Sequence, residues 1–396
     1  MRKSRLTIML ATIRSTYQKI PFNFRWPFFP IKIAYRLIGK FRINIWIIKG
    51  EDSLKRKLSI IYAGSEKHKN YLANLVFGDI YSEIIIGKWL WNIFKITKRE
   101  SSACSLIVLE INKTFKRLFD NKKCFLIPCW IAGEIDISID TASLRKSSTH
   151  KGVLRKIKKH NFQFDVTNEE YQFDNFYHSM YLPYITKTYG DQAILIQYNE
   201  MKKQLKNCDL LLIKKDQEYI GGAILVYGKN VPRIWSIGIK DGNNDYLKAG
   251  ISGALDYFSM IYLKQKGYKK MNYGLSRAFL KDGALQYKKN RGLQVVDSTE
   301  NGFLIKPLSS SIVTKEFFIN NPFIYIDQDG LTEAIFLEND RSYSEKNLKR
   351  LYKKYNLKGI SNFDVYLFGD NIKNIENNAP TELSGRMTFR SAESLF

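Results

Sequence analysis

The stretch "YGLSRAFLKDGALQYKKNRG", residues 273–292, holds the side chains best suited to chemistry. Gly274 follows Tyr273 at the end of a short apolar run, where a glycine lets the backbone turn sharply or approach a ligand closely. Ser276 and Arg277 come next, and an arginine can grip a phosphate or carboxylate with two parallel hydrogen bonds. The pattern predicts a polar site at the end of a strand.

The second half of this stretch predicts a helix over about 283–291, opened by Asp282 as a turn residue or N-cap. Asp282 has a second interpretation, an ion pair with Arg277 that only holds the loop. Tyr287 and Lys288 lie one turn into the helix, where a tyrosine can donate a proton and a lysine can hold an oxyanion or a phosphate. Their structural alternative is a core aromatic residue beside a solvated lysine.

Regular elements are expected to position this stretch. Hydrophobic periodicity predicts helices and strands in the following order: a helix over 169–188, a short helix near 197–206, strands at 209–215, 218–228 and 231–239, a long amphipathic helix over 247–266, a short strand before Gly274 and a last strand at "GLQVVDST". Upstream, strands alternate with helices between residues 58 and 145, which predicts a small α/β unit.

The chain has 396 residues, of which 44% are hydrophobic and 14% aromatic, enough for more than one packed core. It is strongly basic, with 63 Lys and Arg against 38 Asp and Glu and a net charge of +25. Such an excess indicates contact with nucleic acid, an anionic membrane or a phosphate-rich cofactor. The alternative is the composition of a protein from an A/T-biased genome, which the abundance of Ile, Lys and Asn supports.

Several kinds of chemistry find no support in the sequence. The four cysteines lie in or beside apolar runs without a CxxC pair, which predicts buried free thiols in a reducing compartment and no metal site. Walker, HExxH and GxSxG motifs are not found. Because Lys or Arg interrupts every apolar run before the ~18 residues of a membrane span, we expect no transmembrane helix and a cytoplasmic location.

The first fifty residues contain no acidic residue and alternate basic with aromatic side chains. One interpretation is a segment that rests on an anionic bilayer or on the phosphates of a lipid-linked substrate, at the inner face of the membrane. The other is an ordinary first strand and helix with a lysine-rich outer face.

The order of elements after residue 165 is that of a GNAT-type acyltransferase core. Residues 165–300 resemble that superfamily, and in detail its FemAB-like branch, which includes peptidoglycan bridge aminoacyltransferases and acyltransferases of surface-polysaccharide gene clusters. The resemblance is carried by three stretches: residues 176–191, 218–228 and 272–292. It implies an α/β (α+β) fold with a mixed, mostly antiparallel sheet flanked by helices. Arg291 stands where the branch has an aromatic residue, and we expect Arg291 to be a surface charge.

The resemblance implies that an amine or hydroxyl attacks an acyl carbonyl held between two splayed strands, with acyl-coenzyme A as the donor. In the superfamily the donor's pyrophosphate rests on backbone N–H groups at the N-terminus of the long helix. The positions that match this loop are Lys248, Gly250, Ser252 and Gly253. Two of the motif's usual residues are missing, since Leu247 replaces the leading basic residue and Ser252 the second glycine.

The resemblance also implies site roles. Tyr273, Ser276 and Arg277 are expected beside the acyl group as substrate contacts, Tyr287 as the proton donor to the leaving group and Lys288 as the holder of the oxyanion. On the helix over 169–188 and just beyond it, His178 is a candidate general base, and Tyr184 and Asp191 are candidate acceptor contacts. For His178 the alternative is a packing or surface role.

We therefore expect four segments: a basic aromatic N-terminal segment (1–56), a small α/β unit that is a possible first GNAT half (57–148), a GNAT-like acyltransferase domain (149–300) and a C-terminal α/β appendage with a disordered tail (301–396). The expected activity is transfer of an acyl group from acyl-coenzyme A to an amine of a cell-envelope or polysaccharide precursor, whether a small molecule or lipid-linked. One alternative is tRNA-dependent aminoacyl transfer to a peptidoglycan precursor, with the basic residues 151–159 holding the tRNA. The other is a non-catalytic module that binds polyanions.

Overall fold

The computed structural model describes residues 43–87, 89, 92–118, 123–138, 148–190, 193, 195–228, 231–328, 330–338, 343–369, 375–376 and 378–396. Two compact units are present, which we describe separately. The first comprises residues up to Glu110 together with Pro307–Val313, and the second comprises Ile111–Lys306 and Thr314–Phe396. Most of the basic N-terminal segment, residues 1–42, lies outside the described residues. The four segments expected from the sequence stay a prediction.

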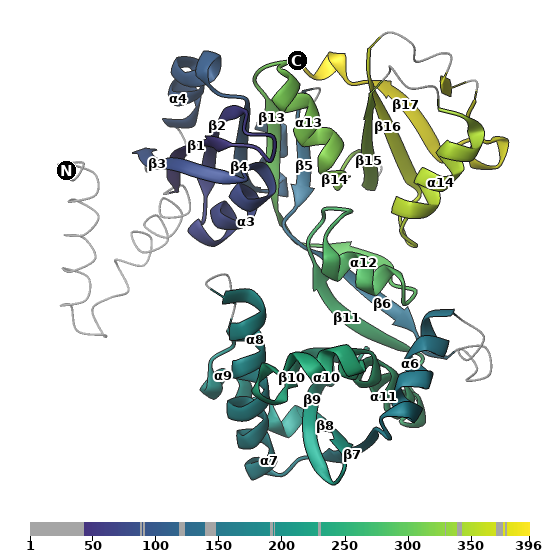
Figure 1. The fold of residues 1–396 in the computed structure, drawn as a ribbon. Helices are drawn as coiled ribbons and strands as arrows, with labels where there is room; N and C mark the ends of the chain where they lie inside the picture. Colours follow the sequence, from purple (N-terminus) through teal and green to yellow (C-terminus); the bar gives the residue numbers. More distant parts are fainter. Residues whose placement is uncertain are drawn as a thin grey trace, which may run out of the picture. The chain divides into compact units, whose positions relative to one another are not determined.

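The first unit contains strands in the order β3-β1-β2-β4 (Figure 1). The strands are β1 (Asn44–Glu51), β2 (Lys57–Gly64), β3 (Asp79–Gly87) and β4 (Leu106–Asn112), and the helices are α3 (Glu66–Val76), α4 (Asn92–Glu100) and the 3₁₀ turn η3 (Ser101–Ala103). β1 is antiparallel to both β2 and β3, whereas β2 and β4 run parallel. The strands after β1 are those predicted from the apolar runs.

The second unit is built on a seven-stranded sheet in the order β12-β6-β11-β10-β9-β8-β7 (Figure 1). Its strands are β6 (Ile131–Asp136), β7 (Gln163–Thr167), β8 (Cys208–Lys215), β9 (Glu218–Val226), β10 (Arg233–Ile239), β11 (Lys270–Ser276) and β12 (Gln294–Ser298). The helices are α6 (Ser148–Lys159), α7 (Glu170–Asn175), α8 (Leu182–Tyr189), α9 (Tyr198–Lys202), α10 (Asn244–Ala249), α11 (Ile251–Gln265) and α12 (Gly283–Lys289). All neighbours are antiparallel except β10 and β11. The predicted fold class, a mostly antiparallel mixed sheet flanked by helices, is confirmed.

Two strands of this sheet were not expected. The apolar run "CFLIPCWI", residues 124–131, predicts one strand of the upstream α/β unit, but the chain breaks at Cys129 and Trp130 into β5 (Phe125–Pro128) and β6. β6 inserts between β11 and β12 and pairs with both. The insertion needs Gly133, since a Cβ there would lie 2.2 Å from Leu293 Cδ1. The hydrophobic periodicity of the sequence also did not predict the edge strand β7.

The parallel strands β10 and β11 share a single registered pair, Arg233 with Asn272, and the Asn272 amide donates to Pro232 O at 2.7 Å. Beyond this point the ladder between them stops. β11 also bulges between Asn272 and Leu275, and Gly274 takes a φ of 72° there, a left-handed conformation that favours glycine. Gly274 thus uses the backbone freedom expected of a glycine, but at a bulge within β11 and not at the end of the strand.

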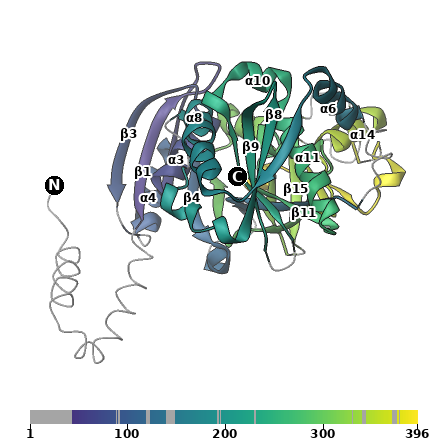
Figure 2. The same ribbon diagram turned by 90° about the horizontal axis from the view of Figure 1, so that it is seen from below.

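Helices cover both faces of the sheet, and paired glycines let them lie close (Figures 1 and 2). Gly221 of β9 meets Ile251 of α11, whereas the next residue, Gly222, meets Phe176 on the opposite face. Phe176–Tyr181 forms a π-helical stretch (η6) between α7 and α8, in place of the single α-helix predicted. In Figure 2, β9 runs between α8 and α11.

The rest of the second unit holds β5 paired with β13 (Asn301–Pro307), helix α13 (Ile312–Asn320, whose first residues belong to the first unit) and a four-stranded sheet. That sheet has the order β14-β15-β16-β17, from Phe323–Ile326, Leu331–Glu338, Asn362–Phe368 and Met387–Ser391, with α14 (Glu345–Tyr355) between β15 and β16. None of the helices in the described part of the chain is long and apolar enough to cross a membrane.

Gly238→Ala is expected to lower the free energy of unfolding by roughly 2 kcal/mol or more, because a Cβ at Gly238 would lie 2.6 Å from the Tyr181 backbone nitrogen. Gly152→Ala in α6 is the matched control, since a Cβ there meets nothing within 4 Å. The free energy of unfolding of this control should rise by about 0.5–1 kcal/mol, because alanine has a higher helix propensity than glycine. Urea unfolding of both variants tests the packing, and equal stabilities would contradict it.

Candidate active site

A buried carboxylate, Asp256 of α11, lies at the centre of the candidate site. Its Oδ2 accepts a hydrogen bond from the Tyr287 hydroxyl, and Arg291 Nε lies 2.9 Å from the same oxygen. Burial raises the pKa of Asp256, while the hydrogen bond from Tyr287 and the Arg291 charge oppose the rise. The carboxylate therefore ties α11 to α12.

Arg291 completes this group. Its guanidinium lies 3.4 Å from the centre of the Tyr287 ring and donates to Tyr287 O at 3.3 Å. The prediction that Arg291 is a surface charge is wrong. The i, i+4 spacing of Tyr287, in α12, and Arg291, just beyond the end of that helix, was a usable signal, but the partner Asp256 is thirty-five positions before Arg291 in the chain.

Lys288 faces the bulge of β11. Its Nζ donates to Leu275 O at 2.8 Å and lies 5.7 Å from the centre of the Tyr273 ring. Burial lowers the pKa of Lys288 to about 8, against the attraction of Asp282 and Asp256. Lys288 is thus an ammonium that titrates close to physiological pH.

Three buried hydroxyls near the parted strands find no hydrogen-bond partner in the described part of the chain: Ser236, Tyr273 and Ser276. Tyr273 is close enough to Asp256 and Tyr287 for their charges to add to the effect of burial and raise its pKa. Buried hydroxyls normally find a partner. These three are therefore available to the polar groups of a substrate.

Tyr184 and Tyr189 of α8 approach the same region. Burial raises the pKa of both tyrosines; the Asp256 charge adds to the rise for Tyr184, and the Asp282 charge adds to it for Tyr189. α8 and α11 cover opposite faces of the sheet. The gap between β10 and β11 therefore lets groups from both faces act on one another.

Arg277 has a structural neighbour that the sequence did not indicate. It is buried, stacks 3.7 Å from the centre of the Trp130 ring and donates to Cys129 O at 3.3 Å. Asp282 caps α12 by accepting from the Leu285 amide at 2.9 Å, as predicted for an N-cap. The alternative of an Arg277–Asp282 pair finds no support in these contacts.

Two predicted residues do not join the group. His178 is exposed and packs its ring against Tyr177 and Tyr198. No contact described for His178 reaches Asp256 or Lys288, so its packing role is the better supported one. Asp191 lies outside the described residues.

The predicted donor loop forms a turn between two helices. Gly250 has a φ of 95° and ends α10, and Ser252 and Gly253 open α11. Lys248 is exposed and lies 3.6 Å from the Asp245 carboxylate. Lys156 of α6, which is not among the predicted site residues, lies across the turn and donates to Lys248 O at 2.9 Å.

Side chains of α6 occupy the space beside this turn. A Cβ on Gly250 would lie 2.5 Å from Lys156 Cδ, and one on Gly253 would lie 2.9 Å from Val153 Cγ2. Lys156 and Lys248 supply the positive charge that a diphosphate requires. A diphosphate reaches the amides of the turn only after Lys156 moves aside.

The arrangement can polarise and hold a carbonyl group. Main-chain groups of β10 beyond Arg233 are not paired with β11 and can donate to an oxyanion. Lys288 places an ammonium at the bulge of β11, and the Tyr287–Asp256 pair is a path for one proton.

No protein-family model and no curated protein matches the chain. Among solved structures, the C-terminal domain of a lysylphosphatidylglycerol synthetase from Agrobacterium fabrum is 12% identical, over 68% of this chain and 82% of its own, with a TM-score of 0.33. FemX is 12% identical, over 65% of this chain and 82% of its own, with a TM-score of 0.36. A GCN5-related N-acetyltransferase from Sphaerobacter thermophilus is 11% identical, over 64% and 74%, with a TM-score of 0.28. The strand order of the seven-stranded sheet and the parted parallel pair β10–β11 agree with the fold expected from the sequence.

Proposed function

We propose that the protein is an acyltransferase that moves an acyl group from an activated ester or thioester to an amine in the gap between β10 and β11. The observation that carries this proposal is the parting of these strands after one registered pair, with Asp256, Tyr287 and Lys288 grouped beside the gap. The acceptor is an amine of a cell-envelope or polysaccharide precursor, as expected from the resemblance.

In this proposal the acyl carbonyl lies along the free side of β10, where backbone N–H groups and the Lys288 ammonium stabilise the oxyanion. The amine nitrogen bonds to the carbonyl carbon, the C–S or C–O bond to the donor breaks, and the amine loses one proton. The donor leaves as a thiolate, or as an alkoxide that takes a proton from water. The Tyr287 oxygen accepts the amine proton while its own proton passes to Asp256. Burial favours this transfer because it raises the pKa of Asp256.

Tyr287 therefore has a different role from the one expected from the resemblance. Its hydroxyl proton already points to Asp256, so the group is arranged to pass a proton inward and not to donate one to the leaving group. Tyr184 and the unpartnered hydroxyls of Tyr273, Ser276 and Ser236 are proposed to contact the substrates.

Acyl-coenzyme A is the first candidate donor, held by Lys156 and Lys248 at the turn around Gly250. A second candidate, an aminoacyl-tRNA, is favoured by α6. This helix carries no acidic residue and exposes Lys151, Arg155, Lys158 and Lys159, a face that suits a nucleic-acid backbone. Because Val153 and Lys156 crowd the turn, a donor that needs no diphosphate cradle also fits the structure.

Isothermal titration with acetyl-coenzyme A and desulfo-coenzyme A separates the two donors. Micromolar binding that weakens about tenfold in Lys156→Ala supports coenzyme A at the turn, because removing one charge-assisted contact costs about 1.4 kcal/mol of binding free energy. The matched variant Lys159→Ala should keep the wild-type affinity. If coenzyme A does not bind, the acyl-coenzyme A proposal fails. Binding of charged tRNA that falls steeply with salt then supports the second donor.

The pH dependence of kcat/KM should reflect Lys288. If its ammonium is required, kcat/KM for acyl transfer to an amine falls as the pH rises through about 8, the pKa of Lys288. Lys288→Arg stays charged across this range, so its profile should lose that alkaline fall. Lys289→Arg is the control and should keep the wild-type profile. An alkaline fall that persists unchanged in Lys288→Arg would remove Lys288 from the mechanism.

Tyr287→Phe keeps the ring that stacks on Arg291 but removes the hydroxyl bonded to Asp256. We expect kcat to fall by about 10²–10⁴, the usual contribution of a positioned acid or base, with little change in KM. The control is Tyr171→Phe, an exposed tyrosine of α7 whose described contacts do not reach Asp256. Unchanged kcat in Tyr287→Phe would contradict the proton path.

A further inference from the structure

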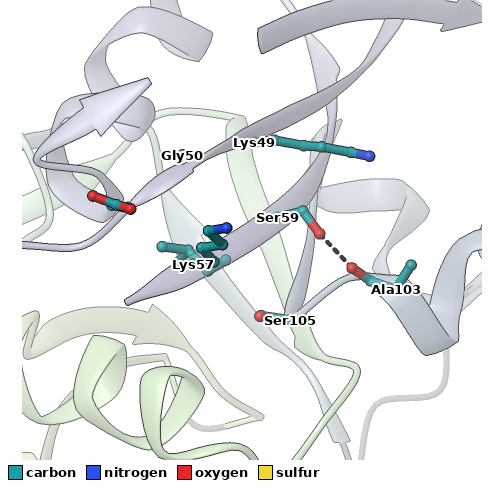
Figure 3. A pocket seen from close by; sticks show the side chains of 8 residues that line it. Lys49, Gly50, Lys57, Ser59, Ala103 and Ser105 are labelled. Carbon is teal, nitrogen blue, oxygen red and sulfur yellow. Dashed lines mark hydrogen bonds between the residues drawn. The ribbon is translucent and has the colours of Figure 1, made fainter. Parts of the chain in front are cut away.

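A pocket in the first unit has no place in the acyl-transfer proposal. It lies over the end of the β1–β2 pair, has a volume of about 620 Å³ and is lined chiefly by Lys49, Glu51, Lys57, Ser59, Ala103 and Ser105 (Figure 3). Its volume falls within the range of roughly 300–1,000 Å³ typical of sites for small ligands.

The strand register explains why these groups share one face. Lys49 is directly opposite Ser59, and Glu51 is opposite Lys57. Directly opposed side chains of an antiparallel pair point to the same side of the sheet, so the two lysines are diagonal neighbours. Lys49 also flanks a register shift between β1 and β3, and such irregularities re-aim side chains.

The floor of the pocket is held by specific bonds. The Ser59 hydroxyl, largely buried, donates to Ala103 O, as Figure 3 shows. The Ser105 amide donates to Ser59 O at 2.8 Å, which holds η3 along β2. The Ser105 hydroxyl lines the pocket, and no hydrogen bond from it is found among the described residues.

The pocket is lined by two basic side chains and one acidic side chain. Neither Lys49 nor Lys57 forms an ion pair or hydrogen bond within the described ranges, in contrast to Lys55, which pairs with Asp79, and Lys69 of α3, which pairs with Glu83. Glu51, the one acid that lines the pocket, lies opposite Lys57 and also acts on Lys55 of the neighbouring turn. The pocket lining therefore keeps a net positive charge.

We propose that this pocket binds a phosphate monoester. Two diagonal ammonium groups repel each other, and a dianion between them removes the repulsion and gains two charge-assisted contacts. The Ser105 hydroxyl can donate to a third phosphate oxygen, while the Ala103 side chain gives the organic part of the ligand an apolar contact. The site is independent of the acyl-transfer proposal, since all its residues belong to the first unit.

Thermal unfolding and isothermal titration of the full chain with glycerol 3-phosphate test the site. The wild type should show a rise of Tm with ligand concentration and a measurable Kd, because a ligand that binds only the folded state stabilises it. The double variant Lys49→Gln/Lys57→Gln should bind at least tenfold more weakly. Both side chains are exposed and unpaired within the described part of the chain, so this variant should fold normally.

The matched control is Lys95→Gln/Lys98→Gln, which removes the same charge from exposed positions of α4 in the same unit. It should keep the wild-type Kd. Equal binding by the two double variants, or no binding of glycerol 3-phosphate by the wild type, would overturn the proposal. If vesicles containing phosphatidic acid bind through Lys49 and Lys57 more tightly than glycerol 3-phosphate does, the ligand is a lipid headgroup with the same phosphate chemistry.

Discussion

The buried carboxylate of Asp256 is the interaction on which the proposed active site depends. A charged group inside a core is tolerated only with close partners, and here the partners are Tyr287 of α12 and Arg291, just after the end of that helix. The helix follows the bulge at Gly274. Because the carboxylate holds this helix against α11, it also determines where Lys288, between the two partners, meets β11.

The site contains groups whose burial destabilises the folded state and groups whose contacts stabilise it. Burial disfavours the charged form of Lys288, and three buried hydroxyls have no partner among the described residues. Another buried carboxylate of the same unit is well satisfied: Asp209 accepts from Tyr227, from Tyr262 at 2.5 Å and from Lys266 at 2.8 Å. Local departures of this kind gather at functional sites, because binding and catalysis need unsatisfied groups.

The seven-stranded sheet is not built from one continuous piece of sequence. β6 precedes α6 in the chain, yet it fills the place between β11 and β12. Without it the outer edge of β11 would expose unpaired backbone groups, which sheets avoid. The same insertion brings Trp130, at the start of β6, under Arg277. An arginine that the sequence suggests as a ligand clamp thus receives an aromatic partner from 147 positions upstream.

The sequence by itself determined the local elements and the turn chemistry. Apolar periodicity marked the strands from β8 to β12 and the long helix, Gly274 marked the turn and Asp282 the helix cap, because these features depend on neighbours within a few positions. It also indicated Tyr287 and Lys288 as candidates. Only the tertiary structure decided which parts of the chain meet: Asp256 with Arg291, Lys156 with the Gly250 turn, and β6 with β11. Such pairings depend on strand order, register and the parting of β10 from β11, and these follow from packing between segments far apart in the chain, which leaves no periodic trace in a single sequence.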